Sequence, residues 1–99
     1  MLLSETFDAA AALACGLVNR VVPPAELAAR THALALQLAQ GPTFAYAQTK
    51  QLVEGSFERS LEAQLEAETQ AFARCAGTAD LAEGVRAFMG KCKPAFGGK

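Results

Sequence analysis

Apolar residues recur every three or four positions along most of the chain, which is the spacing of an amphipathic helix. Glycine or proline interrupts this pattern at intervals and divides it into short segments. The pattern predicts an all-α fold of about five short helices with almost no strand. The predicted helices cover residues 8–15, 24–40, 44–57, 60–76 and 78–90.

Local signals mark where these helices begin and end. Gly16 follows the alanine-rich first segment and predicts its stop, and Pro24 suits the first turn of the second helix. Ser60 and Thr78 are good N-caps for the last two helices, because a hydroxyl oxygen can accept a hydrogen bond from a free backbone N–H group. Between the first two helices, the β-branched stretch 17–22 predicts at most one short extended segment.

The last two predicted helices carry apolar stripes that are wide for so short a chain. The stripe on helix 60–76 contains one charge, Glu68. We expect some of this surface to contact other copies of the chain or a missing domain, because the chain is too short to cover it. The stripe residues are Leu61, Leu65, Phe72 and Cys75 in the first helix, and Leu81, Val85, Phe88 and Met89 in the second.

Composition limits the possible functions. The 99-residue chain is 52% hydrophobic with a formal net charge of -1, which argues against nucleic-acid binding because phosphate neutralisation needs a basic excess. No apolar run approaches the roughly 18 residues that a membrane span requires, so we expect no membrane partner. Cys15, Cys75 and Cys92 are odd in number and widely spaced. This spacing is untypical of a disulfide framework and favours a reducing, cytoplasmic setting.

Charge is distributed unevenly along the chain. Five glutamates fall within 54–68 with only Arg59 among them, whereas the tail from Arg86 onward holds four cations and no acid. Two solvated helix faces would account for this distribution. The alternative is that the C-terminus contacts an anion.

Candidate chemistry is sparse. His32 is the only histidine and falls inside the second predicted helix, and the cysteines lack the C-x-x-C spacing of a zinc site. Glu62 lies four residues from both Glu58 and Glu66, and carboxylates paired on one helix face can move protons. Exposed like charges one turn apart are the commoner meaning of this spacing. We therefore expect no catalytic and no metal-binding residue in the chain.

Five short motifs follow one another in a fixed order. They are Ala9-x-x-Ala12-x-x-x-Gly16-Leu17-Val18-Asn19 with Val21-Val22-Pro23, Thr49-Lys50 with Leu52, Glu68, Thr78-x-Asp80-x-x-Glu83-Gly84-Val85-x-Ala87-Phe88, and Lys91-x-Lys93-Pro94-x-Phe96-x-Gly98. Each motif alone is weak, but their order and spacing over essentially the whole chain are specific. Together they resemble the C-terminal region of the enoyl-CoA hydratase/isomerase (crotonase) family.

This resemblance implies that residues 1–99 are the single helical C-terminal domain of a crotonase-family enzyme, without its catalytic β-β-α core. In the family that core supplies the backbone N–H groups that hold the thioester oxyanion, and the acids that move protons. We therefore expect a segment that is inactive alone, binds no cofactor and self-associates, as the family does in trimers or pairs of trimers. The implied substrate of the full-length parent is a coenzyme A thioester. The ending Phe96-x-Gly98-Lys99 leans toward the branch that acts on phenylacetyl-CoA derivatives.

The resemblance also assigns two binding residues. In the family, an aromatic residue and a lysine from these helices touch the nucleotide end of coenzyme A bound to a neighbouring subunit, and by motif position these are Phe72 and Lys91. A phenyl ring can face adenine, and an ammonium group can meet a phosphate. The alternatives are that Phe72 is a core residue and that Lys91 complements the dipole at a helix C-terminus. Cys92 stands where the family usually has arginine, so the tail has one cation fewer.

Two other functions stay open on the sequence. The chain could be a free-standing helical protein–protein interaction module, which an upstream reading frame encoding the β-β-α core would eliminate. It could also be a small ligand-binding bundle with a Cys/His metal site, which metal-free purified protein would eliminate. The acyl group, and the choice between hydration and isomerisation, are open as well.

Overall fold

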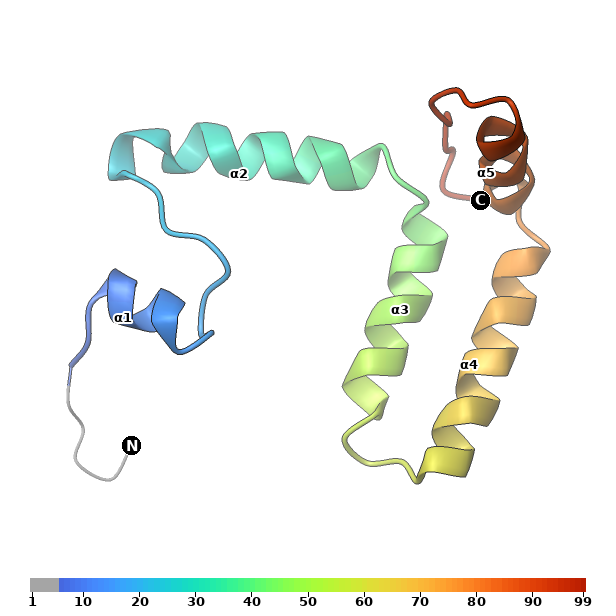
Figure 1. Ribbon diagram of the computed structural model, residues 1–99, viewed down its shortest axis with the longest axis horizontal. Helices are drawn as coiled ribbons and strands as arrows, with labels where there is room; N and C mark the ends of the chain where they lie inside the picture. The colour runs from blue at the N-terminus through green and yellow to red at the C-terminus, as the bar shows by residue number, and fades with distance from the viewer. Residues whose placement is uncertain (1–5) are drawn as a thin grey trace. The chain divides into compact units, whose positions relative to one another are not determined.

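The computed structural model describes residues 6–99, and within this range it contains five α-helices and no β-strand (Figure 1). The predicted all-α class is therefore confirmed, and stretch 17–22 contains no strand. The chain divides into two compact units at the boundary between Ala33 and Leu34. The helices are α1 (Ala9–Ala14), α2 (Pro24–Ala39), α3 (Thr43–Gly55), α4 (Leu61–Ala76) and α5 (Ala79–Met89).

The unit that ends at Ala33 has very little core. Asp8 caps α1 by accepting a hydrogen bond from the Ala11 N–H at 2.8 Å. Gly16, at φ 77°, ends α1 in the left-handed conformation, so that the Leu17 N–H can donate to the Ala12 carbonyl at 2.9 Å. Ala12 is the only buried apolar residue in the described part of this unit. α2 begins here at Pro24, as predicted, and none of its residues is buried.

In the unit from Leu34 to Lys99, α3 and α4 lie side by side and antiparallel (Figure 1). Ser60 caps α4 by accepting from the Ala63 N–H at 3.2 Å. Two polar contacts join the helices: Arg74 Nε donates to Gln48 Oε1 at 2.8 Å, and Gln64 Nε2 donates to the Leu52 carbonyl at 3.5 Å. Ala71 is 3% exposed in the middle of this hairpin. A small side chain at this position allows the two helix backbones to approach closely.

The face of α4 that packs within the chain is not its apolar stripe. Gln64, Ala67 and Ala71 are half-buried or buried and follow one another at helical spacing. By contrast, Leu61, Leu65 and Phe72 are 70%, 54% and 69% exposed. Of the predicted stripe, only Cys75 is half-buried, and the described chain leaves its three large apolar residues uncovered.

The last helix repeats this arrangement. Thr78 caps α5 by accepting from the Leu81 N–H at 3.2 Å. Asp80 and Ala87 are its buried residues. Its large apolar side chains are exposed instead, with values of 39%, 56%, 83% and 77% for Leu81, Val85, Phe88 and Met89.

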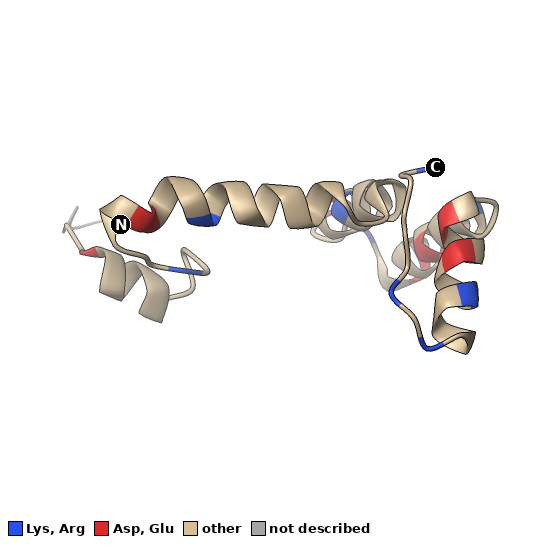
Figure 2. Cartoon of the chain, turned by 90° about the horizontal axis from the view of Figure 1, so that it is seen from above, with Lys and Arg blue, Asp and Glu red and all other residues tan. Residues whose placement is uncertain are grey.

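After α5 the chain reverses and runs back along the helix toward its N-terminus, as Figure 2 shows by the acidic positions on α5 and the basic positions on the returning tail. The reversal uses a left-handed residue, Lys91, at φ 49°. The Cys92 N–H donates to the Ala87 carbonyl at 3.0 Å and the Lys91 N–H to the Phe88 carbonyl at 3.2 Å. These two hydrogen bonds form a Schellman motif, in which glycine usually takes the left-handed position. No helix in the described range is both long and apolar enough to cross a membrane.

Candidate functional site

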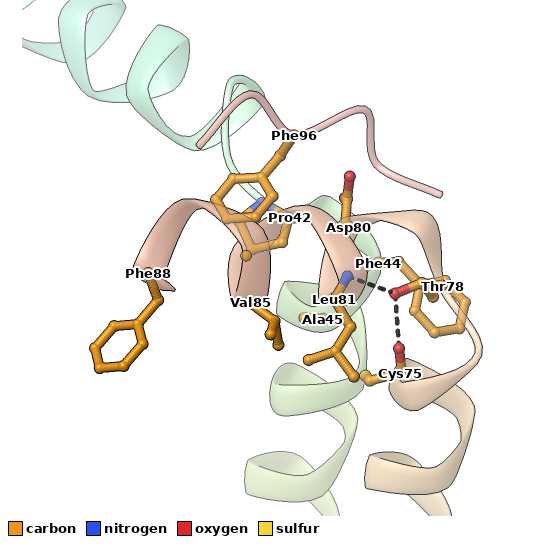
Figure 3. A pocket seen from close by; sticks show the side chains of 11 residues that line it. Pro42, Phe44, Ala45, Cys75, Thr78, Asp80, Leu81, Val85, Phe88 and Phe96 are labelled. Atoms are coloured by element: carbon orange, nitrogen blue, oxygen red, sulfur yellow. Dashed lines mark hydrogen bonds between the residues drawn. The ribbon is translucent and has the colours of Figure 1, made fainter. Parts of the chain in front are cut away.

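An apolar groove lies between the start of α3, the end of α4 and the exposed side of α5 (Figure 3). Its volume is about 350 Å³. The Thr78 hydroxyl at its edge donates to the Cys75 carbonyl at 2.6 Å, so that polar group is already paired. The groove therefore suits an apolar group rather than a charged one. Its main lining residues are Pro42, Phe44, Ala45, Cys75, Leu81, Val85, Phe88 and Phe96.

Phe96 is the one contribution of the tail to this groove, and it extends from the tail toward α5 and Pro42 (Figure 3). A Cβ atom added at Gly84 would lie 3.7 Å from the edge of the Phe96 ring. The ring therefore packs against α5 at the position where the helix has no side chain. A methyl group at this position would be in ordinary van der Waals contact with the ring, so the contact does not by itself require glycine.

On another side of α5, a polar groove of about 450 Å³ separates the helix from the tail. Asp80 is 6% exposed, and its two carboxylate oxygens accept from the Gly97 N–H at 2.6 Å and the Gly98 N–H at 2.8 Å. Glu83 Oε1 accepts from the Ala95 N–H at 2.8 Å. Both acids belong to the motif Thr78-x-Asp80-x-x-Glu83, which predicts no contact with the tail. The available signal was the Gly97-Gly98 pair, whose unhindered N–H groups can approach a carboxylate closely.

The charge of Glu83 in the polar groove is neutralised by Arg86. Arg86 donates to both oxygens of Glu83, from Nε at 2.8 Å and from a terminal nitrogen at 2.7 Å. The Ala95 N–H, and then the Arg86 guanidinium, hold the pKa of Glu83 below its ordinary value, and Glu83 in turn raises the pKa of Arg86. An ionised carboxylate has no proton to donate, and one with a lowered pKa and hydrogen-bonded oxygens is a weak base, so this pair serves structure rather than catalysis.

The glutamates considered for acid–base chemistry do not form a catalytic pair. Glu58 lies in the turn before α4, so the prediction that it shares a helix face with Glu62 is wrong. Glu62 and Glu66 are both on α4 and exposed, and neither lines a groove described above. The backbone N–H of Glu62 and the Ser60 hydroxyl lower the pKa of Glu62, because both favour the ionised form at this helix start.

The two predicted coenzyme A residues are both on the surface. Phe72 is 69% exposed, so the alternative that it is a core residue of this chain is wrong. Lys91 is exposed just after α5, a position that suits both of its suggested roles. Within residues 6–99, the structure does not bring Phe72 and Lys91 into one pocket.

The residues considered for metal binding are dispersed. His32 is exposed on α2, Cys15 and Cys92 are exposed, and Cys75 is half-buried. Among residues 6–99 no three His, Cys, Asp or Glu side chains gather in a way that could hold a metal ion.

Comparison with known proteins decides the family. The sequence matches the family model described as enoyl-CoA hydratase/isomerase over residues 1–99. The chain belongs to the enoyl-CoA hydratase/isomerase family. It is 38% identical over 96 residues to a probable enoyl-CoA hydratase of Mycobacterium bovis, which covers 97% of this chain and 37% of that protein. It is 37% identical over 99 residues to 1,2-epoxyphenylacetyl-CoA isomerase of Escherichia coli, covering 99% of this chain and 37% of that protein.

Solved structures of this family contain the same arrangement of helices. A crystal structure of an enoyl-CoA hydratase/isomerase from Mycobacterium abscessus matches with a TM-score of 0.95 at 37% identity. The match covers 99% of this chain and 38% of that one. The enoyl-CoA hydratase/isomerase chain described here therefore spans somewhat more than a third of the length of the relatives it matches.

Proposed function

We propose that this chain is the assembly and coenzyme-A-edge segment of an enoyl-CoA hydratase/isomerase, and that it catalyses no reaction on its own. The observation that carries the proposal is the exposed apolar side of α4 and α5 on a chain that spans about 37% of its relatives. The two acids that line a groove in the described residues, Asp80 and Glu83, are occupied by hydrogen bonds to the tail and to Arg86. The part of the relatives outside this match is then the source of the catalytic core.

Assembly follows from the cost of leaving large apolar side chains in water. Phe57, Phe88 and Met89 are 87%, 83% and 77% exposed. Burying one such side chain completely is worth roughly 1.5–3 kcal/mol. Contact with other copies, as in trimers or pairs of trimers, or with a catalytic core would recover this free energy.

The proposed coenzyme-A edge is a contact of Phe72 and Lys91 with the nucleotide end of coenzyme A. Both side chains are exposed, so a nucleotide bound to a neighbouring subunit can reach the ring and the ammonium group. An aromatic face suits adenine, and an ammonium group suits a phosphate. A coenzyme A thioester is accordingly the proposed substrate of the complete enzyme.

Two measurements on the purified 99-residue protein test the proposal. Sedimentation velocity over a concentration series should show association beyond the monomer. Hydration of crotonyl-CoA, followed by loss of absorbance of the conjugated thioester, should be no faster than in buffer, with a full-length family member as the active control. A monomer at the highest concentration would contradict the assembly role, and turnover at enzyme-like rates would contradict the inactive state.

A titration with coenzyme A tests the edge role separately. Amide signals near Phe72 and Lys91 should shift in the associated protein, and Lys91→Ala should weaken binding several-fold. Lys93→Ala is the matched control, because Lys93 is an exposed tail lysine two residues away. If both variants lose the same amount of coenzyme A affinity, the lysines act only by nonspecific charge attraction. That result would contradict a specific site at Lys91.

The remaining predictions extend this proposal. Identities of 38% to a hydratase and 37% to an epoxyphenylacetyl-CoA isomerase are equivalent, so they select no acyl group, and the lean toward ring-derived substrates stays a prediction. The cytoplasmic setting is part of the same proposal. A free-standing interaction module is the alternative, and an upstream frame encoding the β-β-α core would eliminate it.

A further inference from the structure

The final six residues, 94–99, are attached to α5 mainly by hydrogen bonds to acidic side chains. Asp80 accepts from the Gly97 and Gly98 N–H groups, and Glu83 accepts from the Ala95 N–H. The Asp80 N–H also donates to the Lys99 carbonyl at 3.0 Å, which occupies a free donor at the start of the helix. We propose that residues 94–99 form a detachable strap, anchored by the Asp80 carboxylate, that builds the Phe96 wall of the apolar groove when it is docked.

Asp80 is the anchor because it is buried and both of its oxygens are used by the strap. It is 6% exposed, whereas Glu83 also pairs with Arg86 and contacts the strap at one N–H only. Hydrogen bonds to a charged group are about twice as strong as neutral ones. None of the strap residues is fully buried, and Phe96 is the one large apolar side chain among them.

Gly98 fits the strap to the start of α3. Its φ of 75° is in the left-handed region, and an added Cβ would lie 2.5 Å from the Thr43 hydroxyl oxygen. Any side chain at this position would therefore clash and strain the backbone. The strap thus depends on two separate features. One is the Asp80 carboxylate on α5, and the other is a residue without a side chain, Gly98, beside α3.

The consequence concerns the apolar groove. Phe96 is the only strap residue that lines it, and its ring packs against α5 at Gly84. Release of the strap removes this wall and uncovers Gly84, while α3, α4 and α5 keep their own hydrogen bonds. Docking and release therefore change the shape of the groove without unfolding the hairpin.

Amide hydrogen exchange and ring contacts, measured by NMR on the complete chain, test the strap. In Asp80→Asn, exchange at residues 95–98 should accelerate at least tenfold, and the nuclear Overhauser contact between the Phe96 ring and Gly84 should disappear. Exchange within α3 and α4 should not change. Gly98→Ala should give the same result without altering α5, and it decides the question if Asp80→Asn fails to fold.

Asp8→Asn is the matched control, because Asp8 caps α1 through a similar carboxylate contact and asparagine caps nearly as well. This variant should leave the exchange of residues 95–98 unchanged. Unchanged tail exchange in Gly98→Ala would overturn the proposal. Equal acceleration throughout α5 and the tail would overturn it too, because the strap would then not detach by itself.

Discussion

The inward and outward sides of α4 and α5 show the reverse of the usual burial pattern of a folded chain, in which large apolar residues are buried and small or polar residues are exposed. The inward side holds small or polar residues with satisfied contacts, such as Ala71, Ala87 and Asp80. The outward side holds the large apolar residues, among them Leu65, which is 54% exposed. Large aliphatic and aromatic side chains are normally the ones found inside. The difference indicates that small residues organise this chain internally, while its large residues are available for surfaces outside it.

The core of the chain is consistent with this division. The buried apolar residues in the range 6–99 are Ala12, Ala71 and Ala87, all of the same small type. A methyl group buries little apolar area, and hydrophobic stabilisation grows with the area buried. The chain therefore has a small internal source of stability, and association that covers the outward side should raise it.

The largest expected effect comes from placing a charge on the outward side. Leu65→Asp should weaken self-association by about 2–4 kcal/mol per contact, because an unpaired carboxylate would be buried where an apolar side chain had been. Sedimentation equilibrium measures this change. Ala63→Asp is the matched control, on another side of α4 and exposed. If both variants associate equally well, the outward side of α4 is not the contact surface.

A larger side chain on the inward side should affect the fold itself. Ala71→Leu should lower the free energy of unfolding by about 1–3 kcal/mol, because the α3–α4 hairpin has no room for three more carbons. Urea unfolding followed by circular dichroism gives the value. Ala73→Leu, at an exposed position of the same helix, should change it little. A stable Ala71→Leu variant would mean that the hairpin is loosely packed.

Replacing Lys91, the strained residue after α5, should have a smaller effect on stability and in the opposite direction. α1 ends in the same Schellman arrangement with Gly16 at the left-handed position, whereas α5 uses Lys91 there at φ 49°. Lys91→Gly should therefore stabilise the chain by about 1 kcal/mol in thermal unfolding, while removing the ammonium group proposed for coenzyme A. Lys93→Gly, where no such strain exists, should not stabilise. A destabilised Lys91→Gly variant would show that the lysine side chain contributes to the fold.

The smallest effect is a pH dependence at the junction between α5 and the tail. Since the folded pKa of Glu83 lies below its ordinary value of 4.5, the contact with the Ala95 N–H is complete above that pH. Its stabilisation is lost as the pH falls through the lowered pKa. The Ala95 amide shift in an NMR titration should have its midpoint below 4.5. Glu83→Gln should abolish the transition, and a midpoint at or above the ordinary value would contradict the assigned contact.

Sequence reasoning succeeded for features that depend on neighbouring residues. Gly16, Ser60 and Thr78 act at the helix ends where their local chemistry predicted them, because caps involve residues only a few positions apart. The all-α class followed from periodicity in the same way.

The features that sequence reasoning missed depend on distant partners. Periodicity shows that Leu61, Leu65 and Phe72 share a stripe, but it does not show whether another element covers them. The bond between Asp80 and Gly97 joins residues 17 positions apart, so no local pattern predicts it. The apolar groove, assembled from α3, α4, α5 and the tail, was missed for the same reason.

The complete exposure of α2 has a consequence for how tightly any partner can hold it. None of its 16 residues is buried, so its helical hydrogen bonds face water and depend on the intrinsic preferences of alanine and leucine. Most helical stability in proteins comes from the packing of one face, and the described chain buries no residue of α2. A partner that docks on α2 must therefore also supply the packing that holds the helix in place. Part of the interaction energy is then spent on ordering, and the measured affinity will be lower than the contact area suggests.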